Sequence, residues 1–222
     1  MGKRFAKGLM GVGTVLFIVA CSGSITSELF IRDLIDIGAN PSTVYFTTTT
    51  IEMESPGEDS LEQLKLKMKE WFREAQNFRQ ITRDYSTFLV ADIKIPVHSR
   101  SQMKLDTTRD LLSLVLEENK EGNIDFGFRF DQGMFEQISS YVKDEFWSSV
   151  SIQDWTFSIV LKNDTRDSQR IILQTVYANQ QPVLFPEEFT LRARDSITIN
   201  FADVLRDYAY KEGEVLFGTL LQ

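Results

Sequence analysis

Two side chains stand out for the chemistry that they could perform, because each is the only one of its type in the 222-residue chain: Cys21 and His98. A thiolate is a nucleophile and a metal ligand, and a thiol can also be acylated or oxidised to a disulfide. A single cysteine permits no disulfide framework, and zinc sites normally draw three or four ligands from Cys and His. Modification of Cys21 is therefore the chemistry that these residues favour.

The residues before Cys21 follow a recognisable order. Lys3, Arg4 and Lys7 form a basic start, the apolar run of residues 10–19 follows, and Ala20 places a small residue just before the cysteine. A positive segment, a short apolar segment and a small residue at a cleavage point are the parts of a secretory signal. The apolar run is shorter than the roughly 20 residues that cross a bilayer. We therefore expect residues 1–20 to be a signal peptide that is removed.

The segment Ile18-Val19-Ala20-Cys21 resembles the lipobox of bacterial lipoproteins. The resemblance implies that Ile18, Val19 and Ala20 are recognised by the signal peptidase, that cleavage precedes Cys21, and that Cys21 is acylated on its sulfur and its new amino terminus. Two or more acyl chains hold a protein stably on a membrane, whereas one binds marginally. The alternative is an ordinary signal peptide with a chance cysteine near its end.

Ser22 follows the cysteine at the position that, in Gram-negative lipoproteins, biases sorting between the two membranes. Aspartate there favours retention in the inner membrane, so by the same resemblance Ser22 implies the cell outer membrane with the protein on its periplasmic side. In a Gram-positive host, the same anchor would sit on the cytoplasmic membrane and face outward.

The charge of the chain limits its partners. The net charge is −8, and removal of the three basic residues in 1–20 leaves −11. Nucleic-acid binding depends on clustered Lys and Arg that release counterions, so we expect no nucleic-acid partner. Anionic headgroups also repel such a surface, so membrane contact should come from the acylated Cys21. The remaining partner is an unknown envelope protein or lipid.

No catalytic set accompanies the two unique residues. His98 lies close to Pro96 in a predicted loop, where we expect it to be solvated, and no serine lies in a nucleophile-elbow glycine pattern. Pairs of carboxylates suited to glycoside hydrolysis cannot be judged from sequence, because their separation is a three-dimensional property. We therefore expect a protein that binds rather than catalyses, with no cofactor and no metal.

The periodicity of the chain predicts an α+β fold with antiparallel or mixed sheets and two amphipathic helices. Residues 21–27 are expected to form a lipidated tether, residues 28–150 an α+β region, and residues 151–222 a β-rich, sandwich-like region packed with it as one unit. Residues 28–37 have two interpretations: a helix capped by Ser27, or a strand over 25–31 followed by one helical turn. About 200 residues, 42% of them apolar, suffice for a core.

The remaining elements follow from local patterns. One helix begins at Ser60 and Gln63, which fit a capping box, and continues its apolar stripe to Phe78. Asp131 is expected to cap the second helix. Alternation predicts strands over 43–53, 87–95 (stopped by Pro96), 110–118, 123–130, 155–161, 170–177, 189–201 and 215–221, with a helical turn over 203–207.

Taken in series, several segments are similar to small lipoproteins carried by tailed phages and prophages. They are the lipobox cysteine, residues 28–37, the capped helix with the strand near 88–97, and the late segments 163–165, 179–183 and 202–204. The resemblance implies a phage or prophage origin and a place in the host envelope. We therefore expect a lipoprotein that modifies that envelope, for example by superinfection exclusion. The alternatives are an envelope protein that carries an apolar ligand, and a cell-wall hydrolase.

Overall fold

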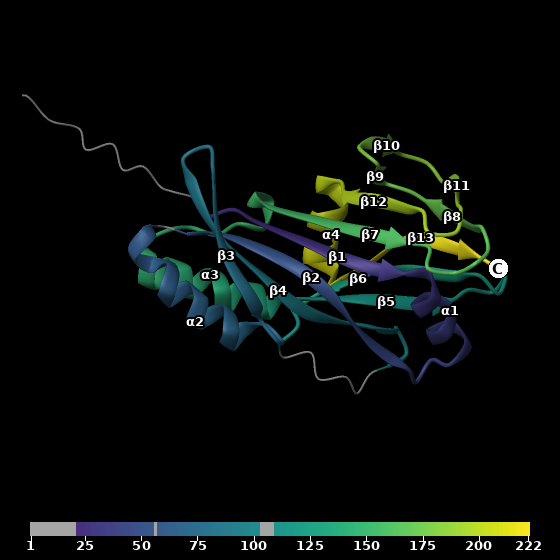
Figure 1. Ribbon diagram of the computed structural model, residues 1–222, viewed down its shortest axis with the longest axis horizontal. Coiled ribbons are helices and arrows are strands. Elements are labelled where there is room, and N and C mark those ends of the chain that lie inside the picture. Colours follow the sequence, from purple (N-terminus) through teal and green to yellow (C-terminus); the bar gives the residue numbers. More distant parts are fainter. Residues whose placement is uncertain (1–20, 56, 103–108) are drawn as a thin grey trace, which may run out of the picture.

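The computed structural model describes residues 21–55, 57–102 and 109–222. Most of this part of the chain is a strongly curved, nearly closed mixed sheet with helices against it (Figure 1). The first half contains β1 Gly23–Phe30, α1 Ile31–Ala39, β2 Val44–Ser55, the 3-10 turn η1 Glu58–Ser60, α2 Leu61–Trp71, β3 Gln76–Arg83, β4 Ser86–Ser99, β5 Leu112–Glu118, β6 Ile124–Phe130 and α3 Gln132–Phe146. The second half contains η2 Ile152–Asp154, β7 Trp155–Lys162, β8 Gln169–Leu173, β9 Val176–Ala178, β10 Gln181–Val183, β11 Glu187–Leu191, β12 Ser196–Phe201, α4 Asp203–Glu212 and β13 Glu214–Leu221.

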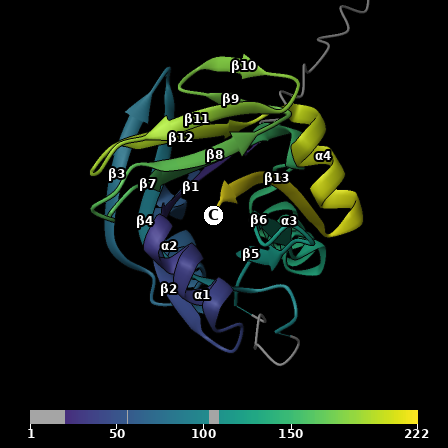
Figure 2. The same cartoon turned by 90° about the vertical axis from the view of Figure 1, so that its right-hand side faces the viewer.

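The strands of the described residues run in the order β10-β9-β12-β7-β1-β2-β4-β5-β6-β13-β8-β11, with β3 added beside β4. The first strand pairs in parallel with β7 along its whole length, from Gly23 opposite Trp155 to Phe30 opposite Lys162. A second parallel pair joins β4 to β5. The strands at one end of the sheet, β10 and β9, are joined to those at the other end, β8 and β11, by short connections. Residues 174–175 join β8 to β9, and residues 184–186 join β10 to β11. The sheet therefore curls back upon itself (Figure 2).

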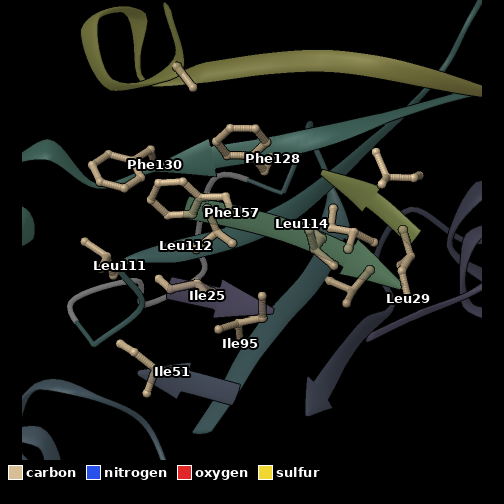
Figure 3. Close-up of a cluster of buried hydrophobic side chains, with 14 of the residues drawn as sticks. Ile25, Leu29, Ile51, Ile95, Leu111, Leu112, Leu114, Phe128, Phe130 and Phe157 are labelled. Atoms are coloured by element: carbon tan, nitrogen blue, oxygen red, sulfur yellow. The ribbon is translucent and has the colours of Figure 1, made fainter. Parts of the chain in front are cut away.

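The interior of the curved sheet is filled by side chains from opposite walls. Ile25, Ile51 and Phe157 of the neighbouring strands β1, β2 and β7 face Leu114 and Phe128 of β5 and β6 across this space (Figure 3). Further rings from β6, β12 and β13 pack there: the ring centroids of Phe128 and Phe201 lie 4.4 Å apart in a stacked pair. Burial of apolar surface on this scale is the main favourable term in folding. Phenylalanines supply a large part of the core that the described residues form: Phe72, Phe126, Phe128, Phe130, Phe135, Phe157 and Phe217 are all buried.

The α+β prediction is confirmed in its broad sense, but its details differ. Residues 151–222 do not form a separate sandwich, because β7 pairs with β1 and β13 pairs with β6, which places both halves in one sheet. Helices α2 and α3 correspond to the two predicted helices, and the described residues also contain α1 and α4. The expected helical turn at 203–207 is the start of α4.

The prediction of a tether over residues 21–27 is wrong. Alternation of Ile25 and Leu29 with polar residues makes this segment the inner strand β1, which is hydrogen-bonded to a neighbour on each side. Of the two interpretations of residues 28–37, the strand followed by helical structure is the one observed. The chain turns at Phe30 into α1, whose Leu34 and Ile37 are buried at the end of the sheet (Figure 1).

The second predicted helix is confirmed and the first is shorter than expected. Asp131 caps α3, because its carboxylate accepts the Met134 N–H at 2.7 Å. Ser60 does not cap α2: its hydroxyl donates to the Gly57 carbonyl instead, and a 3-10 turn precedes the helix. The helix ends at Trp71 because Phe72 adopts an extended backbone and is buried in the core. Phe78, which was expected to continue the apolar stripe, lies in β3.

The fourth strand runs through Pro96, which was expected to stop it. On the side of β4 away from β2, the Lys94 N–H donates to the Arg73 carbonyl, and position 96 faces the same side. On this side, β3 pairs with β4 only as far as Asp92, and β5 pairs with it only from Val97 onward. The N–H that proline lacks would therefore have had no partner in the ladder.

The predicted strand 189–201 is interrupted by a turn that separates β11 from β12. The hairpin of β5 and β6 is confirmed.

Candidate functional site

Cys21 is packed against the segment that follows α3. Its N–H donates to the Ser149 carbonyl at 2.8 Å, and its side chain is only 4% exposed. Burial raises the pKa of the thiol to about 11, although a hydrogen bond with Ser148 acts in the opposite direction. In the folded chain the thiol is therefore protonated and a poor nucleophile. Ile18, Val19 and Ala20 lie outside the described residues.

Ser22, the predicted sorting residue, is fixed by Glu54 of β2. Its N–H and its hydroxyl both donate to one carboxylate oxygen of Glu54, at 3.0 and 2.7 Å, and its carbonyl accepts the Glu54 N–H. Partial burial would raise the pKa of Glu54, but hydrogen bonds from Ser86 and from Ser22 outweigh it and lower that pKa. Residues 21 and 22 are thus part of the folded body.

Two large aromatic side chains near this point are exposed. Trp147 ends α3 in the left-handed conformation, and its side chain is 91% exposed. Tyr85 lies in the turn between β3 and β4 and is fully exposed. A surface hollow of about 400 Å³ beside the indole is lined by Trp147, Ser148, Ser149 and two residues of α3. Neither aromatic was singled out from sequence, because exposure of a ring depends on which segments cover it.

A second hollow, of about 540 Å³, lies between the start of β1 and the β3–β4 turn. Its lining includes Glu52, Glu54, Asp84 and Asp154, with Arg83 as the cation among them. The Arg83 guanidinium pairs with the carboxylate of Glu52. This end of the molecule therefore has an acidic rim beside its exposed rings. Such a rim disfavours anionic ligands.

His98 is not the solvated loop residue that was expected. It lies in β4 and is fully buried, with Nδ1 2.9 Å from the Ser99 carbonyl and Nε2 without a hydrogen-bond partner. Burial is the main cause that lowers the pKa of the imidazole. A buried ring cannot meet a substrate, so His98 packs rather than reacts.

Two further observations limit the site. None of the helices in residues 21–55, 57–102 and 109–222 has the length and apolar character needed to span a bilayer. Within the same residues, no three His, Cys, Asp or Glu side chains gather in a way that could hold a metal ion.

Comparison with known proteins gives one match. Neither the curated proteins nor the solved structures contain a match to this chain. A family model described as a domain of unknown function, DUF7424, matches residues 23–220. The matched region begins at the first residue of β1 and ends one residue before the last residue of β13, so it coincides with the curved sheet and its helices. The chain therefore belongs to the DUF7424 family.

Proposed function

We propose that this protein is a lipoprotein of the bacterial envelope that acts by binding and not by catalysis, held on the periplasmic face of the outer membrane by an acylated Cys21. The observation that carries the proposal is the order of parts at the amino end. A secretory pattern ends in Ile18-Val19-Ala20-Cys21, and the family domain begins two residues later, at Gly23. An anchor joined directly to a folded domain needs no spanning helix.

Acylation must precede folding of this segment. The thiolate is the reactive form of cysteine, and in the folded chain burial keeps the thiol protonated with a pKa of about 11. In an unfolded exported chain, the same thiol is solvated and has an ordinary pKa. We therefore expect modification on the newly exported chain, before the Cys21 N–H pairs with the Ser149 carbonyl.

Radiolabelled palmitate and envelope fractionation test the anchor. We expect the full-length protein to incorporate palmitate and to fractionate with the outer membrane, and Cys21→Ser to lose both properties. Ser22→Asp should retain the label but move the protein to the inner membrane, whereas Ser22→Ala, the matched control, should leave it in the outer membrane. Palmitate incorporation by Cys21→Ser equal to that of the wild type would refute the proposal.

The binding role is supported by apolar side chains on the outer surface. Leu184 and Phe185, in the connection between β10 and β11, are 73% and 79% exposed, and Tyr177 of the neighbouring strand is also exposed. Exposed apolar groups that gather in one place mark interaction surfaces more often than scattered ones do. We propose an envelope protein of the host as the partner, in a phage- or prophage-encoded system that excludes a second phage.

Phage challenge tests this role. A susceptible host that expresses the protein should plate at least one phage of a broad panel less efficiently than the empty host does. Leu184→Ser with Phe185→Ser should restore plating, while Val204→Ser with Tyr208→Ser, an exposed apolar pair on α4, should not. Unchanged plating across the panel would refute exclusion, and equal loss in both double variants would refute the assigned surface.

The two alternative functions have less support. An apolar-ligand carrier needs an interior space, but in the described residues the inside of the sheet is occupied by rings in contact, as in the stacked pair of Phe128 and Phe201. The carboxylates that a cell-wall hydrolase would use are those of the hollow beside β1, but there Glu52 is paired with Arg83 and Glu54 is hydrogen-bonded to Ser22. Mass spectrometry of natively purified protein and digestion assays on peptidoglycan test these alternatives.

A further inference from the structure

No flexible linker separates Cys21, the proposed anchoring residue, from the folded domain, because β1 begins at Gly23. Acylation would turn the buried Cys21 side chain outward, but Ser22 is hydrogen-bonded to Glu54 and Gly23 already pairs with Trp155 in the sheet. One residue of extended chain spans at most about 3.6 Å. A lipid group attached to Cys21 would therefore hold this end of the sheet within a few ångströms of the headgroup layer.

Both exposed aromatics are connected to residues 21 and 22 by short chains of contacts. Trp147 directly precedes Ser148 and Ser149, which bond to Cys21. Tyr85 directly precedes Ser86, which hydrogen-bonds Glu54, the carboxylate that also holds Ser22. Figure 1 shows the turn between β3 and β4 and the end of α3 at the same end of the molecule as the start of β1. The segments that carry both rings therefore lie at the end of the molecule from which the anchor would leave.

Tryptophan and tyrosine have an apolar body and a polar tip, and they concentrate at membrane–water interfaces for that reason. In water, the exposed indole of Trp147 and phenol of Tyr85 leave much apolar surface unburied. Insertion at headgroup level would bury this surface while the polar atoms stay hydrated. The acidic rim of Glu52, Asp84 and Asp154 would repel anionic headgroups, so zwitterionic lipid fits this face better.

We infer that this end of the molecule is a membrane-docking face, with Trp147 and Tyr85 inserted at headgroup level on either side of the acylated Cys21. The partner is the surface of a zwitterionic bilayer. The inference rests on the proposed lipid anchor and adds a fixed orientation to it. In that orientation the strand β1 leads away from the membrane, and the turn between β5 and β6 lies at the far end, because β1 and β5 point the same way in the sheet.

Quenching of tryptophan fluorescence by brominated lipid tests the orientation. The full-length lipoprotein, purified from envelopes and reconstituted in phosphatidylcholine vesicles brominated near the headgroup, should show quenching that Trp147→Phe largely loses. The other two tryptophans, Trp71 and the fully buried Trp155, remain in every variant as a constant background. Adding Tyr85→Trp to Trp147→Phe should restore quenching. Adding Lys120→Trp, in the exposed turn between β5 and β6, should not.

The outcomes distinguish failure of the docking face from failure of the proposed lipid anchor. If the protein is acylated and stays with the vesicles, but Trp147→Phe is quenched as strongly as the wild type, the docking face is refuted and the anchor stands. Equal quenching of the Tyr85→Trp and Lys120→Trp variants would also refute the orientation. If the protein carries no acyl group and does not bind vesicles, the proposed function itself is refuted. Thermal unfolding of each variant verifies that it is folded.

Discussion

Replacement of Gly23 by alanine tests whether the segment after Cys21 is a packed strand. A Cβ atom at this position would lie 2.6–2.7 Å from three ring atoms of Trp155, its partner in the parallel ladder. Ordinary carbon contacts are about 3.5–4.0 Å, so the overlap is close to 1 Å. Trp155 is fully buried and packs edge-on against the ring of Phe135, with centroids 5.7 Å apart, so it has little room to withdraw.

The expected cost combines two effects of opposite sign. Overpacking of a well-filled site costs about 1–3 kcal/mol, and the loss of glycine's freedom in the unfolded chain returns about 0.4–1 kcal/mol. Gly23→Ala should therefore lower the free energy of unfolding by about 1–2 kcal/mol, which corresponds to roughly 2–8 °C in Tm for a protein of this size. A flexible tether would make the same substitution neutral or slightly stabilising.

A double-mutant cycle assigns the cost to the overlap with the indole. Urea unfolding would be measured for residues 21–222 with Cys21→Ser as the reference, then with Gly23→Ala, with Trp155→Phe and with both. The smaller phenyl ring should relieve the clash, so Gly23→Ala should cost much less in the Trp155→Phe background, with a coupling of about 1 kcal/mol or more. Equal costs in the two backgrounds, or no cost in either, would show that Gly23 does not pack on Trp155.

Three further perturbations follow from the structure. Burial lowers the pKa of His98 below its ordinary value of 6.5, so at low pH the unfolded chain binds a proton that the folded chain does not. The free energy of unfolding should therefore fall as the pH drops below 6.5. Urea titrations at several pH values should show a smaller fall in His98→Gln. Asp131→Ala should cost about 1 kcal/mol by removing the cap of α3, whereas Ser60→Ala, at a position that makes no cap bond, should cost less in the same assay. Asn163→Ala should lower stability by about 3 kcal/mol, because the two N–H donors of its buried amide are shared among three backbone carbonyls and its oxygen accepts from Thr165. A loss under about 1 kcal/mol would contradict this reasoning.

Local patterns predicted the elements whose boundaries depend on nearby residues. The alternation of Phe126, Phe128 and Phe130 gave a strand with one face in the core, and the hairpin with β5 followed from the polar turn between them. Asp131 was recognisable as a cap because a carboxylate three residues before an N–H satisfies an orphan donor whatever the rest of the fold.

The wrong predictions concern residues whose role depends on distant segments. Pro96 was expected to end a strand, but the gap between β3 and β5 leaves its missing N–H without consequence. Phe72 ends α2 because the core accepts its ring at that point. In both cases the deciding partner lies outside the window over which periodicity can be read.

The sequence by itself determined the secretory pattern before Cys21, the acidic charge, and the strands and capped helix that local periodicity specifies. Tertiary structure alone decided that β1 begins at Gly23, that β1 lies between β2 and β7, and that Cys21 rests on Ser149. The physical reason is that a side-chain pattern records which face of an element is apolar, but not which distant element will cover it. Strand pairing between residues more than 100 positions apart closes the sheet, and it also brings Trp147 and Tyr85 to the end that carries Cys21.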